Sequence, residues 1–299
     1  MSGNSELGFR ELLQKSIVDG IRIETPVILT GQYRKVYDLL QDAIDANVTP
    51  CLVGPPGVGK SLLARKVSED LGRGFYEVFF DENMTPSRLI GSFDPALVVR
   101  GGRTVDSFEP GPLMRAMVEG GLFVAHELNR ATEFCQNSLI APLEERHYHL
   151  YPFGMVKAHD NFSFIATQNP IETSGTYRLS RVLVDRIGCW IRMTYPDKET
   201  ELEILKVNAP AFNLAPDIME KIYSIVNETR NHPDLEIPAS PRAGIFLTRL
   251  VDRFMDRFDS VDDAIRYFAS SVLAKEMRVR NPNKTVKIVV DEILNKHLR

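Results

Sequence analysis

The segment Gly54-Pro55-Pro56-Gly57-Val58-Gly59-Lys60-Ser61 fits the pattern G-x-x-x-x-G-K-[ST]. Glycines allow the backbone to curl until several N–H groups point at one polyphosphate, and a following helix adds its positive N-terminal end. In this pattern the lysine reaches the β- and γ-phosphates and the Ser61 hydroxyl ligates Mg²⁺. Residues 51–53 read as a buried strand before the segment, and residues 60–71 as a helix after it. Strand, loop and helix in this order are what the pattern requires.

Composition limits the possible classes of protein. With 299 residues, 43% hydrophobic and 25% charged, the chain can form one large or two ordinary domains. The net charge of −4 argues against general attraction to nucleic acid or anionic membrane. There is no run of about 18 apolar residues and no apolar signal core in residues 1–15, so we expect a cytoplasmic protein without a membrane span. The three cysteines, Cys51, Cys135 and Cys189, indicate buried thiols rather than disulfides or a zinc site.

Apolar runs alternate with helical patterns up to about residue 195, which predicts a parallel α/β sheet. The pattern then becomes helical. We therefore expect an α/β domain over residues 1–195, with a short N-terminal helical segment, and a smaller all-α lid over residues 196–299. The predicted strands are residues 51–53, 75–80, 122–125, 162–167 and 189–193. The lid is predicted to have helices at residues 199–207, 216–229, 241–258 and 261–279, with no strand before residues 286–290. Hairpins are predicted at residues 96–108 and 147–157.

Two further strands end in polar residues that suit phosphate chemistry. Residues 122–125 lead into His126 and Glu127, and residues 162–167 lead into Asn169. Ligands of open α/β sheets bind at the carboxyl ends of the strands. Glu127 could polarise an attacking water there, and Asn169 could hydrogen-bond the γ-phosphate or that water. Taken alone, each residue also fits an ordinary turn position.

Two arginines complete the set of candidates. Arg186 lies at the end of a predicted helix, and Arg242 follows Ser240-Pro241 at the start of another. A guanidinium pairs bidentately with phosphate oxygens. Either arginine taken alone is better explained as a surface ion pair.

These five elements, in this order and spacing, resemble the AAA+ ATPases and specifically the MoxR family. The resemblance spans nearly the whole chain. It is dense at residues 111–113, 127–131, 166–170, 175–177, 185–186 and 239–243.

The resemblance implies a P-loop NTPase core with a five-stranded parallel sheet and a helical lid, an ATPase that uses ATP and Mg²⁺. Glu127 corresponds to the catalytic glutamate, Asn169 to sensor 1, Arg186 to the arginine finger and Arg242 to the sensor 2 arginine. Ser61 and His126 stand at the metal positions. The nucleotide-binding residues are Gly54, Pro55, Pro56, Gly57, Val58, Gly59, Lys60, Ser61 and Leu62. A finger that acts on a neighbour implies a homo-oligomer, expected to be a hexameric ring. The two predicted hairpins would face its pore.

The family also suggests biological partners. MoxR proteins commonly work with a von Willebrand factor A protein, and they act as chaperone-like remodellers of a protein client or metalloenzyme complex.

His126 departs from the family, because it stands where the Walker B aspartate is expected. Neutral imidazole brings no negative charge, and imidazolium would repel a cation. Two interpretations stay open. Ser61 and the phosphates could hold Mg²⁺ while the imidazole accepts a bond from its water, or Mg²⁺ binding and hydrolysis could both be weak. On the second interpretation, His126→Asp raises turnover at low Mg²⁺.

Two alternative functions follow. The first is a nucleic-acid motor, because related AAA+ proteins with an insert in helix 2 include helicases. The net negative charge of the chain argues against a nucleic-acid partner. A weakly hydrolysing, nucleotide-gated scaffold is the alternative that His126 motivates.

Overall fold

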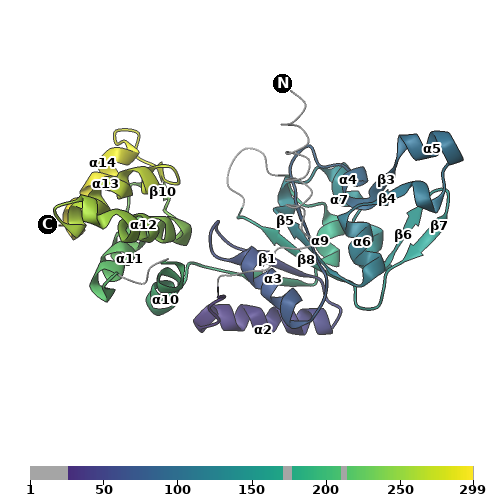
Figure 1. Ribbon diagram of the computed structural model, residues 1–299, viewed down its shortest axis with the longest axis horizontal. Coiled ribbons are helices and arrows are strands. Elements are labelled where there is room, and N and C mark those ends of the chain that lie inside the picture. Colours follow the sequence, from purple (N-terminus) through teal and green to yellow (C-terminus); the bar gives the residue numbers. More distant parts are fainter. Residues whose placement is uncertain (1–25, 171–176, 210–213, 299) are drawn as a thin grey trace, which may run out of the picture.

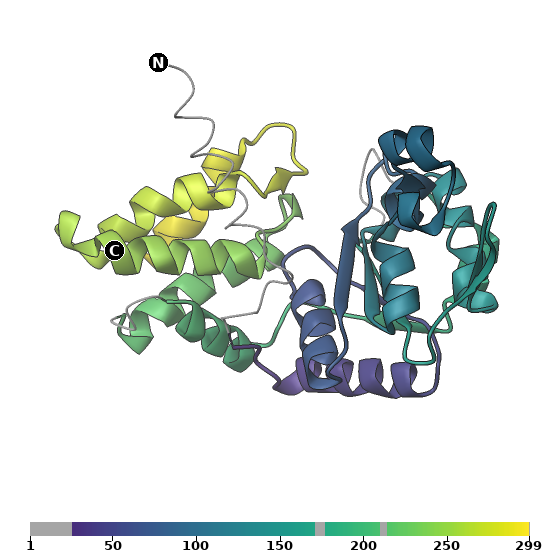
Figure 2. The same ribbon diagram turned by 45° about the vertical axis from the view of Figure 1, so that its right-hand side comes forward.

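The computed structural model describes residues 26–170, 177–209 and 214–298. Figure 1 and Figure 2 show two parts beside one another, an α/β part around a sheet and a helical part at the C-terminal end. Most of the predicted N-terminal segment, and the motif residues Gly175 and Thr176, lie outside the described residues.

A five-stranded parallel sheet is the centre of the α/β part, as predicted. Its order is β2-β5-β8-β1-β9, and every neighbouring pair is parallel. The strands are β1 (Pro50–Val53), β2 (Phe75–Phe79), β5 (Leu122–His126), β8 (Ser163–Gln168) and β9 (Cys189–Arg192). Their carboxyl ends meet at one edge, the edge to which the phosphate-binding segment belongs.

Helices cover both faces of this sheet, so alternate strand residues enter two different cores. Leu122 and Val124 pack with α2 (Gly31–Asp45) and α3 (Lys60–Asp70). Phe123 and Ala125 point the other way. The helices on their side are α4 (Pro86–Ile90), α6 (Pro112–Glu119), α7 (Glu133–Asn137), α8 (Ile140–Glu144) and α9 (Arg181–Arg186). Burial on both faces explains why the inner strands β1, β5 and β8 read as apolar runs.

The first predicted hairpin is wrong in that helical segments, and not a short turn, connect its two strands. Strands β3 (Gly91–Phe93) and β4 (Phe108–Pro110) do pair antiparallel, but α5 (Pro95–Gly101) and a short 3-10 turn (Val105–Ser107) lie between them. A proline begins α5, and the Asp94 carboxylate accepts the backbone N–H groups of its first turn.

The second hairpin is confirmed, as β6 (His147–Leu150) pairs with β7 (Gly154–Lys157). The turn of this hairpin reaches β3, because the ring centroids of Phe153 and Phe93 are 5.8 Å apart. The β3–β4 segment and the β6–β7 hairpin therefore meet at one end of the α/β part (Figure 1).

The helical part contains five α-helices within the described residues. They are α10 (Lys198–Asn208), α11 (Pro216–Asn231), α12 (Pro241–Phe254), α13 (Val261–Ala274) and α14 (Val286–His297). Their apolar faces form a core separate from those of the sheet.

Two predictions about the helical part are wrong. The predicted strand at residues 286–290 is the start of α14, where the Thr285 hydroxyl caps the helix and Val289, Val290, Ile293 and Leu294 are buried at helical spacing. The part is also not all-α. The helix predicted to run to residue 279 ends at residue 274, and β11 (Arg278–Val279) pairs with β10 (Leu235–Ile237).

Cys51 and Cys135 are buried free thiols, as predicted, whereas Cys189 is only half-buried. None of the helices in the described ranges has the length and apolar character needed to cross a bilayer.

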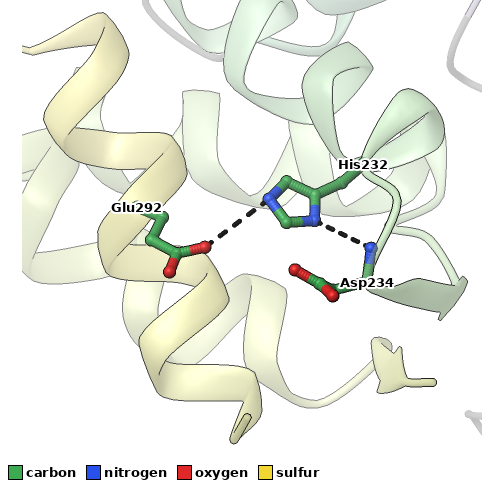
Figure 3. Close-up of side chains that lie close together, drawn as sticks. All are labelled: His232, Asp234 and Glu292. Atoms are coloured by element: carbon green, nitrogen blue, oxygen red, sulfur yellow. Dashed lines mark hydrogen bonds and ion pairs between the residues drawn. The ribbon is translucent and has the colours of Figure 1, made fainter. Parts of the chain in front are cut away.

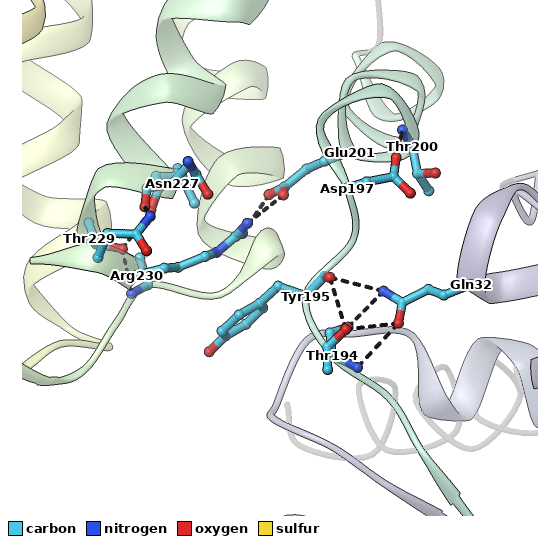
Figure 4. A network of polar contacts seen from close by, with 12 residues as sticks. Gln32, Thr194, Tyr195, Asp197, Thr200, Glu201, Asn227, Thr229 and Arg230 are labelled. Carbon is cyan, nitrogen blue, oxygen red and sulfur yellow. Dashed lines mark hydrogen bonds and ion pairs between the residues drawn. The ribbon is translucent and has the colours of Figure 1, made fainter.

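A polar network joins the two parts (Figure 4). The Gln32 side chain of α2 donates to the carbonyl oxygens of Thr194 and Tyr195 in the connecting segment. The Arg230 guanidinium lies 4.4 Å from the centroid of the Tyr195 ring and pairs with both carboxylate oxygens of Glu201 at 2.7 Å. The Glu201 side chain is 1% exposed. This buried pair therefore fixes α11 against α10 directly beside the connection.

We predict that Glu201→Ala lowers the free energy of unfolding by about 3–5 kcal/mol, because it leaves the Arg230 charge buried and unpaired. Urea denaturation of the full chain measures this. The control is Glu220→Ala, which removes a pair to Lys198 whose side chains are more than half exposed; its cost should stay below about 1 kcal/mol. Equal costs for the two substitutions would contradict the prediction.

Candidate functional site

The phosphate loop has the backbone that the sequence requires. Gly57 and Gly59 adopt positive φ angles of 77° and 85°, and Gly59 is the residue before the first turn of α3. Gly57 also lies where the helical part approaches, since a Cβ there would meet the Ser240 side chain at 2.9 Å. The loop therefore faces both its own helix and the start of α12.

Lys60 is held inside this loop. Its ammonium donates to the carbonyl oxygens of Gly54 and Pro55 at 2.6 and 2.8 Å, and to Oδ1 of Asn169 at 2.8 Å. The residue is 8% exposed. Burial lowers the pKa of Lys60 to about 8, although Glu127 nearby acts in the opposite direction. The site thus contains a cation that an incoming anion would stabilise.

Most of the predicted site residues line one pocket of about 290 Å³ at this edge of the sheet. The predicted residues in its lining are Pro56, Gly57, Gly59, Lys60, Ser61, Leu62, His126, Glu127, Asn169 and Arg242. Gly54 and Pro55 contribute carbonyl oxygens to Lys60, and Val58 is buried in the core. Arg242 enters from α12, so the structure brings this arginine to the phosphate loop of its own chain.

An apolar hollow of about 260 Å³ adjoins the pocket and shares Gly57, Gly59, Leu62 and Ile245 with it. Side chains from α2, α3, α10 and α12 line it, together with the segment before α2; they include Tyr33, Leu63, Ile204, Val207 and Val27. Sequence reasoning missed this hollow, because its lining comes from segments far apart in the chain.

Glu127 follows β5 in the left-handed region, with φ 53°. Its backbone N–H donates to the Thr167 hydroxyl at 3.3 Å, and its carboxylate pairs with Nε of Arg130 at 2.6 Å. Thr167 also lines the pocket and was not singled out from the sequence. Glu127 is therefore beside the pocket, with its carboxylate held by an arginine three residues later.

His126 belongs to a polar chain that reaches into β2. Its Nε2 lies 3.0 Å from Oε2 of Glu77, and its Nδ1 lies 3.3 Å from Oγ of Ser61. The Phe79 ring stacks on the imidazole at 4.4 Å between centroids. The hydrogen bond from His126, aided by Arg65, holds the pKa of Glu77 below its usual range. Glu77 and Phe79 were missed from the sequence; their only signal is that alternate residues of a strand share a face.

Arg186 is not in the pocket of its own chain. It lies at the end of α9, where its Nε and Nη2 donate to Oε2 of Glu144 at 3.1 and 2.5 Å. Val182 and Val184 on the same helix are exposed. The predicted arginine finger is thus on a different surface from the phosphate loop.

A second polar cluster lies in the helical part (Figure 3). His232, Asp234 and Glu292 offer ligand atoms within 4.8 Å of one another. However, the Lys284 ammonium already pairs with Asp234 at 2.9 Å and with Glu292 at 2.7 Å, and these contacts raise the pKa of the lysine. The two carboxylates therefore have a cation, and the cluster joins α14 to the segment before β10.

The sequence profile of the AAA domain (dynein-related subfamily) matches residues 50–187, from the first strand of the sheet to the end of α9. This range contains the phosphate loop, Glu127, Asn169 and Arg186.

Three relatives are similar over longer or overlapping ranges. The uncharacterized protein YeaC of Bacillus subtilis is 28% identical, over 80% of this chain and 80% of its own. The gas vesicle ATPase GvpN of Haloferax mediterranei is 28% identical, over 83% of this chain and 76% of its own. The chaperone MoxR1 of Mycobacterium tuberculosis is 31% identical, over 61% of this chain and 45% of its own.

Among solved structures, NtrX from Brucella abortus in complex with ADP has the same fold, with a TM-score of 0.56 at 16% identity over 87% of this chain and 58% of that one. The domain match and these relatives support the resemblance of the chain to the MoxR family of AAA+ ATPases.

Proposed function

We propose that this protein hydrolyses ATP at the subunit interfaces of a homo-oligomeric ring, hexameric in its complete form, and uses the energy to remodel a protein client. One observation carries the proposal. Lys60, Glu127, Asn169 and Arg242 line one pocket, while Arg186 is held on another surface by Glu144. Such a division suits an active site that a neighbouring subunit completes.

Within one subunit, residues 54–62 bind the phosphates and Lys60 compensates their charge. The apolar hollow takes the base. Glu127 polarises the attacking water when its pair with Arg130 opens, and Asn169 positions that water or the phosphate. Arg242 binds the phosphates of the nucleotide in the pocket of its own chain. The exposed Val182 and Val184 beside Arg186 would be covered by the neighbouring subunit.

The donor atoms at the end of β5 fit a divalent cation. Ser61 Oγ and His126 Nδ1 lie 3.3 Å apart beside the loop, and both residues line the pocket. A cation bound there with the nucleotide would supply charge neutralisation to the phosphates. Ser61 and His126 would hold it, and Glu77 would orient the imidazole.

We place the domain boundary at residues 195 and 196, so that residues 1–195 act as the nucleotide-binding core and residues 196–299 as the lid. The contact of Gly57 with Ser240 supports this division, because a nucleotide would lie against both parts.

The chaperone role rests on the family and on the name of MoxR1. The client is unidentified, and a von Willebrand factor A partner stays a prediction, as does the cytoplasmic location. One observation favours a second candidate, the weakly hydrolysing nucleotide-gated scaffold: a histidine, not a carboxylate, ends β5.

Subunit complementation tests the shared site. Glu127→Gln and Arg186→Ala should each abolish steady-state ATPase activity, which in the wild type should rise with protein concentration. Mixing the two inactive variants should restore activity, because about a quarter of the interfaces in random rings join an intact pocket to an intact finger.

Arg181→Ala is the matched control, since Arg181 is exposed on the same helix as Arg186. It should retain activity. Mixtures that stay inactive although both variants assemble would overturn the shared site. Wild-type ADP binding without turnover in the assembled ring would favour the scaffold.

Lys60 predicts a pH dependence of nucleotide binding. Bound polyphosphate favours the charged lysine, so ADP affinity without divalent metal should be constant below the pKa of about 8 and weaken above it, by at most about tenfold per pH unit. Equilibrium titrations of ADP in chelator at pH about 7 to 9.5 measure this. Lys60→Arg should remove the dependence, because arginine stays charged over this range. A flat wild-type profile would contradict the lowered pKa.

A further inference from the structure

The His126 ring is held in one orientation with one nitrogen left for the pocket. Oε2 of Glu77 lies 3.0 Å from Nε2, and the other carboxylate oxygen of Glu77 pairs with Arg65, so the carboxylate is an acceptor here. Nε2 therefore carries a hydrogen, and in the neutral ring Nδ1 then offers a lone pair. That lone pair faces Ser61. A carboxylate behind a histidine is the arrangement that orients metal-ligating imidazoles in proteins.

Neighbouring groups keep this arrangement in place. Nη2 of Arg65 pairs with the other oxygen of Glu77 at 2.5 Å, so the carboxylate is balanced by a permanent charge. The stacked Phe79 ring and an exposed fraction of only 2% for the His126 side chain restrict rotation of the imidazole. Surface histidines are not fixed in this way. The cost of ordering the ring is met during folding, before any ligand arrives.

The distance between the two donor atoms suits a shared cation. Adjacent ligands of a six-coordinate ion lie about 3 Å apart when each is about 2.1 Å from the metal. Ser61 Oγ and His126 Nδ1 are 3.3 Å apart. Little movement would therefore bring both atoms to one ion.

We propose that Nδ1 of His126 is a direct ligand of the nucleotide-bound cation, that Glu77 is its positioning residue, and that the site prefers borderline transition-metal cations such as Co²⁺, Ni²⁺ or Zn²⁺ to Mg²⁺. The proposal rests on nucleotide binding in this pocket. Imidazole suits these cations, whereas Mg²⁺ selects oxygen and keeps its water. The replacement of the family's aspartate is then a change of metal preference and not a loss of the metal site.

Electron spin-echo envelope modulation of the full-length protein with Mn²⁺ and ADP tests direct ligation, with Mn²⁺ as the spectroscopic probe. The spectrum should contain a directly bound imidazole nitrogen, and labelling the histidines with ¹⁵N should replace the ¹⁴N pattern. His126→Asp should remove the signal, while His149→Asp, in the exposed part of the hairpin, should keep it. The labelling experiment needs no variant and so does not depend on the folding of one.

Affinity measurements test the metal preference and Glu77. The Co²⁺-to-Mg²⁺ ratio of ADP affinities should fall by about tenfold or more in His126→Asp. Glu77→Gln should weaken Co²⁺ binding by about 10–100-fold and leave metal-free ADP affinity unchanged, whereas Glu82→Gln, at an exposed position, should alter neither.

The outcomes separate this inference from the proposed function. Bound ADP and Mn²⁺ with no histidine nitrogen coupling, or an unchanged metal ratio in His126→Asp, would overturn the inference alone. No ADP binding under any condition would overturn the proposed function.

Discussion

The buried ammonium of Lys60 is the constraint on which the site depends. A cation with 8% exposure is costly unless its hydrogens are satisfied, and here three oxygens from the loop and from Asn169 receive them. These bonds tie the carboxyl end of β1 to that of β8 and fix the first turn of α3. The remaining desolvation penalty appears as a pKa lowered to about 8. The same electrostatics that shape the loop therefore favour a polyphosphate in the pocket.

The sheet could be predicted from sequence because its inner strands β1, β5 and β8 are largely buried on both faces and give continuous apolar runs. The errors occur where local pattern is ambiguous or where pairing is non-local. The run at residues 286–290 is apolar and β-branched, and it is helical because the next turn continues its buried face. The short β10 and β11 exist only because segments some forty residues apart pair, since Leu235 opposes Val279. No local signal of two or three residues could reveal that contact.

The candidate site likewise contains residues that the sequence reveals and residues that only the fold brings together. Lys60, Glu127, Asn169 and Arg242 could be found because they belong to spaced motifs at strand and helix ends. Glu77 and Phe79 could not, because their place beside His126 depends on the register of β2 against β5, in which Phe79 opposes His126. A shift of one residue would turn both side chains to the other face of the sheet. The environment that decides what His126 can do is therefore a tertiary property.

The connection between the two parts limits how they can move. Gln32 holds the backbone of Thr194 and Tyr195 to α2, and the Tyr195 ring lies against Arg230, which Glu201 fixes within the helical part. Pro196 follows Tyr195 directly, and its ring fixes φ at the start of the helical part. Few backbone torsions can then absorb a rotation of the helical part. Because Ser240 lies directly against Gly57, even a small rotation changes the space above the phosphate loop. A ligand that contacts both Lys60 and Arg242 is thereby coupled to the orientation of α12, and a stiff junction of this kind transmits the coupling to the rest of the helical part.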